Sequence, residues 1–237
     1  AVASNPDGLV VSIPDRDALS RPIQNAMKAG IPVVSINSGY EASEELGVIT
    51  HVGQAPYEAG YAGGERLAEA GVQKAICVNH TVGNVALDRR CEGLSDAMAE
   101  AGGSSKVLAA QVGDPTESQQ RIQAQLSSNP EIDGLLALGP STTKPSLRAL
   151  QETESHDRVT MATFDLSPRI LREIKEGRIR FAIDQQPYMQ GYMPVVLMNL
   201  HHQNSSAYPD EVMRTGPAFV TKENVGELMT LTEKGLR

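Results

Sequence analysis

Short apolar stretches rich in valine, isoleucine and leucine alternate along the chain with longer stretches of helical period. Near-continuous apolar stretches are typical of parallel strands that are covered by helices on both faces. The pattern predicts strands at 8–13, 31–36, 48–52, 74–78, 106–112, 133–138, 158–164 and 180–183, and helices at 18–29, 56–70, 84–101, 117–127, 143–152 and 168–176. These elements indicate an α/β fold with parallel sheets, helices on both faces and right-handed crossovers.

The chain after residue 184 follows a different order. The pattern predicts a helix at 188–201, a polar loop, an extended stretch at 214–221 and a last helix at 223–234. A chain that completes one set of strand–helix units, crosses over and adds a helix elsewhere is typical of two lobes.

Ligands of open α/β sheets bind beyond the carboxyl ends of the strands. The residues at these predicted ends are Ser12, Asn37, His80, Gly139, Asp165 and Gln185. Several of them are polar groups that form hydrogen bonds with hydroxyls, so a neutral polar ligand suits this edge of the sheets.

Composition narrows the class of partner. The 237 residues carry 21 Lys+Arg and 29 Asp+Glu, a net charge of −8, which argues against nucleic acid or an anionic membrane surface as partner. No stretch of about 18 apolar residues exists to span a membrane. No phosphate-binding loop, nucleophile elbow or metal-ligand motif occurs in the sequence, so we expect no cofactor, no metal and no catalysis.

The two cysteines, Cys77 and Cys91, are too few for a disulfide framework or a zinc set. A disulfide between them would require an oxidising compartment. The pattern instead favours two buried thiols that pack as small hydrophobic groups, one on a strand and one on a helix. Their redox state is left open by the sequence.

Five segments, in this order and spacing, resemble the periplasmic sugar-binding proteins of the ribose-binding type, which are the solute receptors of ABC importers. The segments are Pro6–Ser12, Ala29–Val34, Arg90–Leu94, Phe164–Pro168 and Ile183–Tyr192. The resemblance covers essentially the whole chain and implies the type I periplasmic binding protein fold. That fold has two similar α/β lobes joined by three crossovers, with the sugar between them.

The resemblance also implies a division of the chain. Members of the family begin with roughly 50–60 residues that precede the Pro6–Ser12 segment, so we expect an incomplete first lobe. The expected divisions are 1–72 for the first lobe, 73–184 for the second, 185–213 for the return to the first, and 214–237 for the third crossover and the C-terminal segment.

Three residues match the family's sugar-binding positions. Asp165 matches the hydroxyl-accepting aspartate, although it could instead cap the following helix. Arg90 matches the sugar-binding arginine, with a surface arginine paired to Glu92 or Asp88 as the alternative. Gln185 matches the glutamine of the second crossover, or serves as a turn residue before Pro187.

Four further ligand-binding candidates lie at strand ends. Asn37 stands where relatives carry aspartate or asparagine, and Ser12 where they carry asparagine or serine. His80 and Asn84 flank the first turn of the second lobe. The alternatives are turn residues, a solvent-facing hydroxyl and helix capping. Gly139 stands where relatives often carry asparagine or aspartate, which leaves the identity of the sugar open.

The predicted function is therefore binding of a sugar or polyol and its delivery to a membrane permease of the ABC type, by closure of the two lobes. The resemblance implies a monomer in the periplasm, or a lipid-anchored extracellular protein in a single-membrane bacterium. The alternative is the effector-binding domain of a sugar-responsive transcription regulator, which shares the fold. An enzyme is a third class, because fold alone does not exclude catalysis.

Overall fold

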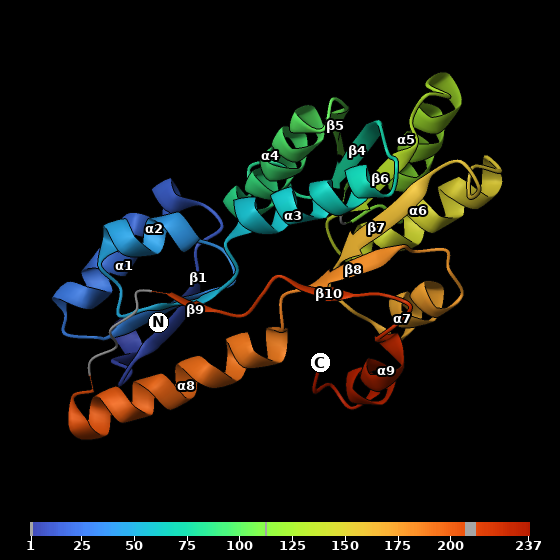
Figure 1. The fold of residues 1–237 in the computed structure, drawn as a ribbon. Coiled ribbons are helices and arrows are strands. Elements are labelled where there is room, and N and C mark those ends of the chain that lie inside the picture. The colour runs from blue at the N-terminus through green and yellow to red at the C-terminus, as the bar shows by residue number, and fades with distance from the viewer. Residues whose placement is uncertain (1, 112, 207–211) are drawn as a thin grey trace. The chain divides into compact units, whose positions relative to one another are not determined.

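Helices and strands alternate throughout the computed structural model, which describes residues 2–111, 113–206 and 212–237 (Figure 1). The chain forms two compact units. Unit 1 comprises Ala1–Ala55, Gly83–Ala86 and Gln186–Gly216, and unit 2 comprises Pro56–Val82, Leu87–Gln185 and Pro217–Arg237.

Unit 1 is built on a four-stranded parallel sheet with strand order β1-β2-β3-β9. Helices α1 and α2 pack on one face, and α8 packs on the other through Leu197 with Val34 and Val52. A short 3-10 helix, Val2–Ser4, precedes the first strand. The strands are β1 (Leu9–Ser12), β2 (Val33–Ile36), β3 (His51–Gly53) and β9 (Val212–Arg214), and the helices are α1 (Arg16–Lys28), α2 (Tyr40–Leu46) and α8 (Pro187–Asn204).

Unit 2 is built on a six-stranded sheet with strand order β10-β8-β7-β6-β4-β5, in which only β10 is antiparallel to its neighbour. The strands are β4 (Lys74–Asn79), β5 (Ser104–Ala109), β6 (Gly134–Ala137), β7 (Thr160–Phe164), β8 (Phe181–Asp184) and β10 (Ala218–Val220). The helices are α3 (Pro56–Glu69), α4 (Val85–Glu100), α5 (Pro115–Ser128), α6 (Pro140–Glu152), α7 (Pro168–Lys175) and α9 (Val225–Glu233).

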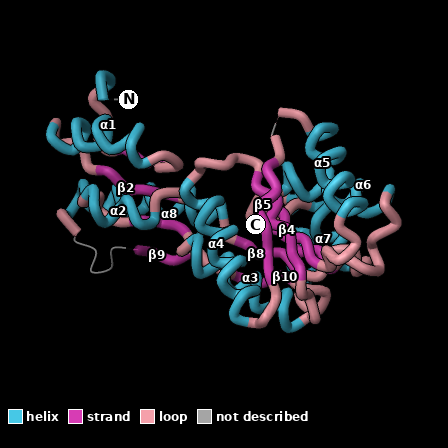
Figure 2. Tube along the Cα trace, turned by 90° about the horizontal axis from the view of Figure 1, so that it is seen from above, coloured by secondary structure: helices cyan, strands magenta, loops and turns pink. Residues whose placement is uncertain are grey.

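Both faces of the unit 2 sheet are buried. Helices α3 and α4 lie on one side of the strands, and α5, α6 and α7 lie on the other (Figure 2). Successive strand residues face opposite sides, so Cys77 and Phe164 pack with α3 and α4, whereas Ile76 and Val78 pack with the helices of the other side. This double burial explains the near-continuous apolar strands and confirms the predicted fold class.

Helices α3 and α4 approach each other at backbone distance. A Cβ atom at Gly60 of α3 would lie 2.0 Å from the Arg90 carbonyl oxygen of α4, and one at Gly93 would lie 2.1 Å from the Tyr57 carbonyl oxygen. Glycine is therefore required at both positions. This contact groups α3 with unit 2, whereas the sequence-based division placed residues 56–72 in the first lobe.

The element pattern was largely predicted, with several differences. The single extended stretch predicted at 214–221 is two strands, β9 in the unit 1 sheet and β10 in the unit 2 sheet, and the 3-10 helix Val2–Ser4 was not predicted. Helix α2 was not predicted, because seven residues are too few to display a helical period. The strand predicted at 106–112 is β5, which begins earlier, at Ser104, and ends at Ala109. Residue 112, and residues 207–211 of the predicted return segment, lie outside the described residues.

Candidate functional site

Polar residues follow the carboxyl ends of neighbouring parallel strands in unit 2. Asp165 follows β7, Gln185 follows β8, His80 follows β4, and Arg90 projects from α4. Because the carboxyl ends of parallel strands meet at one edge of a sheet, these four predicted residues share that edge.

Arg90, Gln185 and Asp165 form a chain of side-chain hydrogen bonds. The Arg90 Nη2 group donates to Gln185 Oε1 at 3.0 Å, and Gln185 Nε2 donates to Asp165 Oδ1 at 2.6 Å. The Arg90 guanidinium also lies over the Phe164 ring, 4.1 Å from its centroid. Arg90 is 4% exposed and Gln185 is 7% exposed. The guanidinium is thus held in one orientation by an amide and a ring, which excludes the alternative of a surface arginine.

Burial and opposite charge act against each other in this chain. Burial lowers the pKa of the Arg90 guanidinium to about 10, and the Asp165 charge partly opposes that change. Burial raises the pKa of the Asp165 carboxyl, whereas Arg90 and the Gln185 hydrogen bond lower it. Each charge therefore depends on the other for its stability in a poorly solvated place.

The neighbouring Arg89 provides the contrast. Its guanidinium pairs with the exposed Glu92 and lies 4.9 Å from the centroid of the Tyr57 ring. The alternative role of Asp165 as a helix cap is also wrong, since the Ser167 side chain caps α7 by accepting from the Ile170 amide at 3.2 Å.

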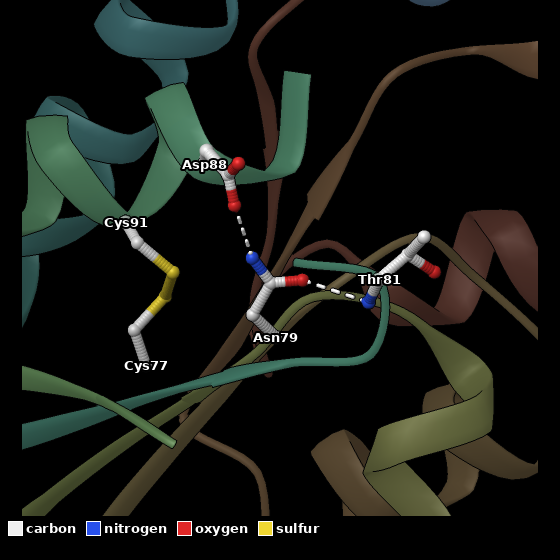
Figure 3. The surroundings of a disulfide bond; sticks show 5 residues. All are labelled: Cys77, Asn79, Thr81, Asp88 and Cys91. Atoms are coloured by element: carbon white, nitrogen blue, oxygen red, sulfur yellow. Dashed lines mark hydrogen bonds between the residues drawn. A yellow bond between two sulfur atoms is a disulfide. The ribbon is translucent and has the colours of Figure 1, made fainter. Parts of the chain in front are cut away.

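The helix that carries Arg90 is fixed to the sheet by a disulfide. Cys77 of β4 and Cys91 of α4 are bonded, and Asn79 Nδ2 donates to Asp88 Oδ1 at 2.8 Å beside them (Figure 3). The prediction of two buried free thiols is therefore wrong. The two residues are buried as expected, but their side chains face each other because α4 packs directly on β4.

His80 lies close to the same carboxylate. A Cβ atom at Gly139 would lie 3.5 Å from His80 Cε1 and 3.7 Å from Asp165 Oδ2. Burial and the Arg90 charge lower the pKa of the His80 imidazole, so it is neutral at neutral pH. A side chain at position 139 would thus enter the space between the imidazole and the carboxylate.

The three other predicted residues lie in unit 1 and are uncharged. Ser38 Oγ lies 3.4 Å from both Asn37 Oδ1 and Asn84 Oδ1, and the Ser38 amide lies 3.4 Å from Ser12 Oγ. Asn84 Oδ1 also accepts from the Ala86 amide at 3.0 Å, as the helix-capping alternative requires. Asn37, Ser12 and Asn84 are thereby brought together around one buried serine.

Two further polar side chains of unit 1 were missed by sequence reasoning. Gln190 of α8 accepts from Asn37 Nδ2 at 3.3 Å and donates to Thr215 Oγ1 at 3.0 Å. Gln190 is 4% exposed and Thr215 is fully buried. The position of Gln190, one helical turn after Gln186, was the signal that could have identified it.

The backbone is unusual at three of these positions. Asn37, Asp165 and Gln186 have φ angles of 61°, 65° and 55°, in the left-handed region. Asparagine and aspartate tolerate this region better than most residues, and such conformations cluster where side chains are aimed at ligands. In the turn after β2 and in the turn after β7, a residue with left-handed backbone therefore directs a polar side chain.

Within the part of the chain that the structure describes, no group of three histidine, cysteine or carboxylate side chains is placed to hold a metal ion. No helix formed by the described residues has the length and hydropathy needed to cross a membrane.

The chain resembles known proteins over most of its length. A carbohydrate transporter protein of Acidothermus cellulolyticus 11B, solved in complex with myo-inositol, is 34% identical with a TM-score of 0.95, covering 100% of this chain and 81% of the other. The xylose/arabinose-binding protein XylF of Sulfolobus acidocaldarius is 26% identical, covering 95% of this chain and 59% of its own length. The ribose import binding protein RbsB of Salmonella typhimurium is 26% identical over 76% of this chain and 60% of its own length.

The chain thus spans about three fifths of the length of these two curated relatives. A family model described as the periplasmic binding protein domain matches residues 1–205. The match covers most of the chain and the fold agrees with it, so the chain belongs to the periplasmic binding protein domain family.

Proposed function

We propose that this protein is a solute receptor that binds a sugar or cyclic polyol and presents it to an ABC-type importer. The observation that carries the proposal is the buried chain from Arg90 through Gln185 to Asp165. An ionised carboxylate only accepts hydrogen bonds and a guanidinium only donates them, so together they satisfy both sides of a ligand hydroxyl.

The charges of this group favour a neutral ligand. One guanidinium and one carboxylate balance each other, and the groups around Ser38 in unit 1 are amides and hydroxyls. A ligand that lacks hydroxyls leaves buried donors and acceptors unpaired, at a cost of about 1–3 kcal/mol each. Specificity for a polyhydroxylated ring follows.

The ligand class is sharpened by one relative. The Acidothermus protein was solved with myo-inositol, and at 34% identity it is the first guide to the ligand of this chain. A cyclic polyol presents hydroxyls around a whole ring. The candidate residues that we expect to bind these hydroxyls are Asp165, Arg90, Gln185, His80, Asn37, Ser12 and Asn84.

The receptor acts by binding and conformational change, without chemistry of its own. Ligand contacts to both units favour a closed form, which the permease recognises. The Cys77–Cys91 disulfide favours a location outside the cytoplasm, in the periplasm or on the cell surface. The relatives named above are a transporter protein and two binding proteins, so transport is preferred to gene regulation.

Ligand-induced thermal stabilisation tests the proposal. The panel is myo-inositol, ribose, arabinose, xylose and glucose, with mannitol as an acyclic polyol. A ligand present at 100 times its dissociation constant stabilises the folded chain by about 2.7 kcal/mol, which raises the melting temperature measurably. A shift with one ring class supports the receptor and identifies its ligand. A folded chain that no member of the panel stabilises would exclude the proposal.

A further inference from the structure

A hollow of about 410 Å³ opens on the surface of unit 2 where helices α6 and α7 and the turns after them meet. Both helices lie on the same side of the unit 2 sheet (Figure 2). The two turns lead into β7 and β8, so the hollow lies towards the amino ends of these strands, whereas the candidate ligand site lies at their carboxyl ends. Its polar lining consists of Arg148, Gln151, His156, Arg169, Glu173 and Arg178.

Positive charge is concentrated in this hollow. The lining holds three guanidiniums and one imidazole together with one carboxylate, that of Glu173. A second carboxylate, that of Glu176, lies outside the lining and is bonded to Arg178. Three guanidiniums therefore outnumber two carboxylates, on a chain whose net charge is −8. A concave surface with this excess of positive charge attracts anions.

The carboxylate in the lining fixes two of the guanidiniums. Glu173 is 8% exposed, its Oε1 atom lies 3.5 Å from Nε of Arg169, and its Oε2 atom accepts a hydrogen bond from Nε of Arg178. Nη2 of Arg178 donates to Glu176. Among the described residues, no acceptor takes Nη1 of Arg178 or either Nη group of Arg169. Two guanidiniums are thus held in place while several of their donors remain for an acceptor from solvent.

The third guanidinium, that of Arg148, has no acidic partner of its own. It lies on α6, and the carboxylate one helical turn later, Glu152, accepts hydrogen bonds from Gln119 and Gln123 of α5 instead. In the part of the chain that the structure describes, the side chains of Arg148 and His156 form no hydrogen bond or ion pair. The ion pairs of α7 therefore do not explain why a guanidinium and an imidazole line the hollow beside them.

We propose that this hollow binds a small oxyanion that carries two or more negative charges, such as a diphosphate or a tricarboxylate. Planar guanidiniums bind phosphate and carboxylate oxygens through paired, charge-assisted hydrogen bonds. Guanidiniums contributed by two helices suit an anion with several charged oxygens better than a monovalent ion such as chloride. The volume of the hollow falls within the range of about 300–1,000 Å³ that is typical of small-molecule sites. This site goes beyond the proposed function, because none of its residues belongs to the candidate sugar site.

The test is calorimetric titration of the full chain with pyrophosphate and, separately, with citrate. An ionic strength of about 0.15 M suppresses non-specific attraction between distant charges. Arg148→Gln binds the anion about tenfold more weakly, because it removes one set of charge-assisted hydrogen bonds. This variant keeps the fold, since Arg148 holds no other side chain in place. Arg172→Gln is the matched control and binds as the unaltered protein does, because Arg172 is an exposed arginine of α7 that does not line the hollow.

NMR of the arginine Nε–Hε groups locates the bound anion. The signals of Arg148 and Arg178 shift on titration with the tighter-binding anion, whereas the signal of Arg172 does not. Tighter binding of pyrophosphate supports a site for phosphate-type ligands, and tighter binding of citrate supports a site for polycarboxylates. The proposal is overturned if neither anion binds, or if Arg148→Gln and Arg172→Gln lose affinity equally.

Discussion

The two units present different chemistry at their strand ends. In unit 2 the candidate residues are charged and tightly bonded, with hydrogen bonds of 2.6 and 3.0 Å along the chain from Asp165 through Gln185 to Arg90. In unit 1 they are amides and hydroxyls, and Ser38 lies 3.4 Å from each of the three candidates Ser12, Asn37 and Asn84. Charge-assisted hydrogen bonds are shorter and about twice as strong as neutral ones, so the unit 2 group is organised before a ligand arrives.

The elements that support the candidate residues are also held more firmly in unit 2 than in unit 1. In unit 2 the helix that carries Arg90 is bonded covalently to β4 and packs against α3 without intervening side chains. In unit 1 the corresponding groups lie on turns and on one helix, and the outer strand β1 carries the exposed Val10. We infer that unit 2 holds its candidate residues in a fixed orientation, whereas unit 1 holds its candidate residues less tightly, and three experiments test this difference.

Arg90→Met has the largest expected effect on binding. The variant removes the donors that Gln185 and the ligand share and leaves Asp165 without its opposite charge, so affinity falls about 100-fold in calorimetry. Arg89→Met is the matched control, because it removes the same charge one position earlier from an exposed side chain. A comparable loss in both variants would contradict the assignment of the binding role to Arg90.

The double variant Cys77→Ala/Cys91→Ala has its main effect on stability. The bond closes a loop with a sequence separation of 14. Loss of a bond across a loop of about 15 residues lowers the free energy of unfolding by about 3 kcal/mol in the chain-entropy model. Urea unfolding measures this loss, and calorimetry shows a smaller loss of affinity as α4 gains freedom. Unchanged affinity would show that the glycine contacts of α3 suffice to hold Arg90.

Asn37→Ala has the smallest expected effect of the three. The side chain donates to Gln190 Oε1 at 3.3 Å and accepts from Ser38 Oγ at 3.4 Å, and both of these partners are neutral. Loss of one neutral hydrogen bond to a ligand lowers affinity about tenfold at most. Asn25→Ala, on the exposed side of α1, serves as control in the same calorimetric assay. A loss as large as that of Arg90→Met would remove the distinction between a fixed unit and an adaptable one.

Much of the fold could be predicted because most strands are short apolar stretches and most helices are long enough to show a helical period. Asp165 and Asn37 could be predicted as candidates because each directly follows an apolar strand in the sequence. The pairing of Cys77 with Cys91 could not be predicted, because it depends on the rotation of α4 over β4. The contact of Arg237 with Asp184 joins segments far apart in the chain, and no local pattern encodes such a pair.

The left-handed backbone at Asn37, Asp165 and Gln186 has a consequence for the evolution of this protein. Glycine adopts that conformation without strain, so replacing any of the three relieves a conformational cost of the folded chain. A selection for heat resistance alone would therefore accept glycine at these positions. It would remove two candidate ligand-binding side chains, Asn37 and Asp165, and the Gln186 amide that donates to the Thr215 carbonyl. At these positions glycine would favour the stability of the folded chain, whereas the present side chains would favour the interactions that they make.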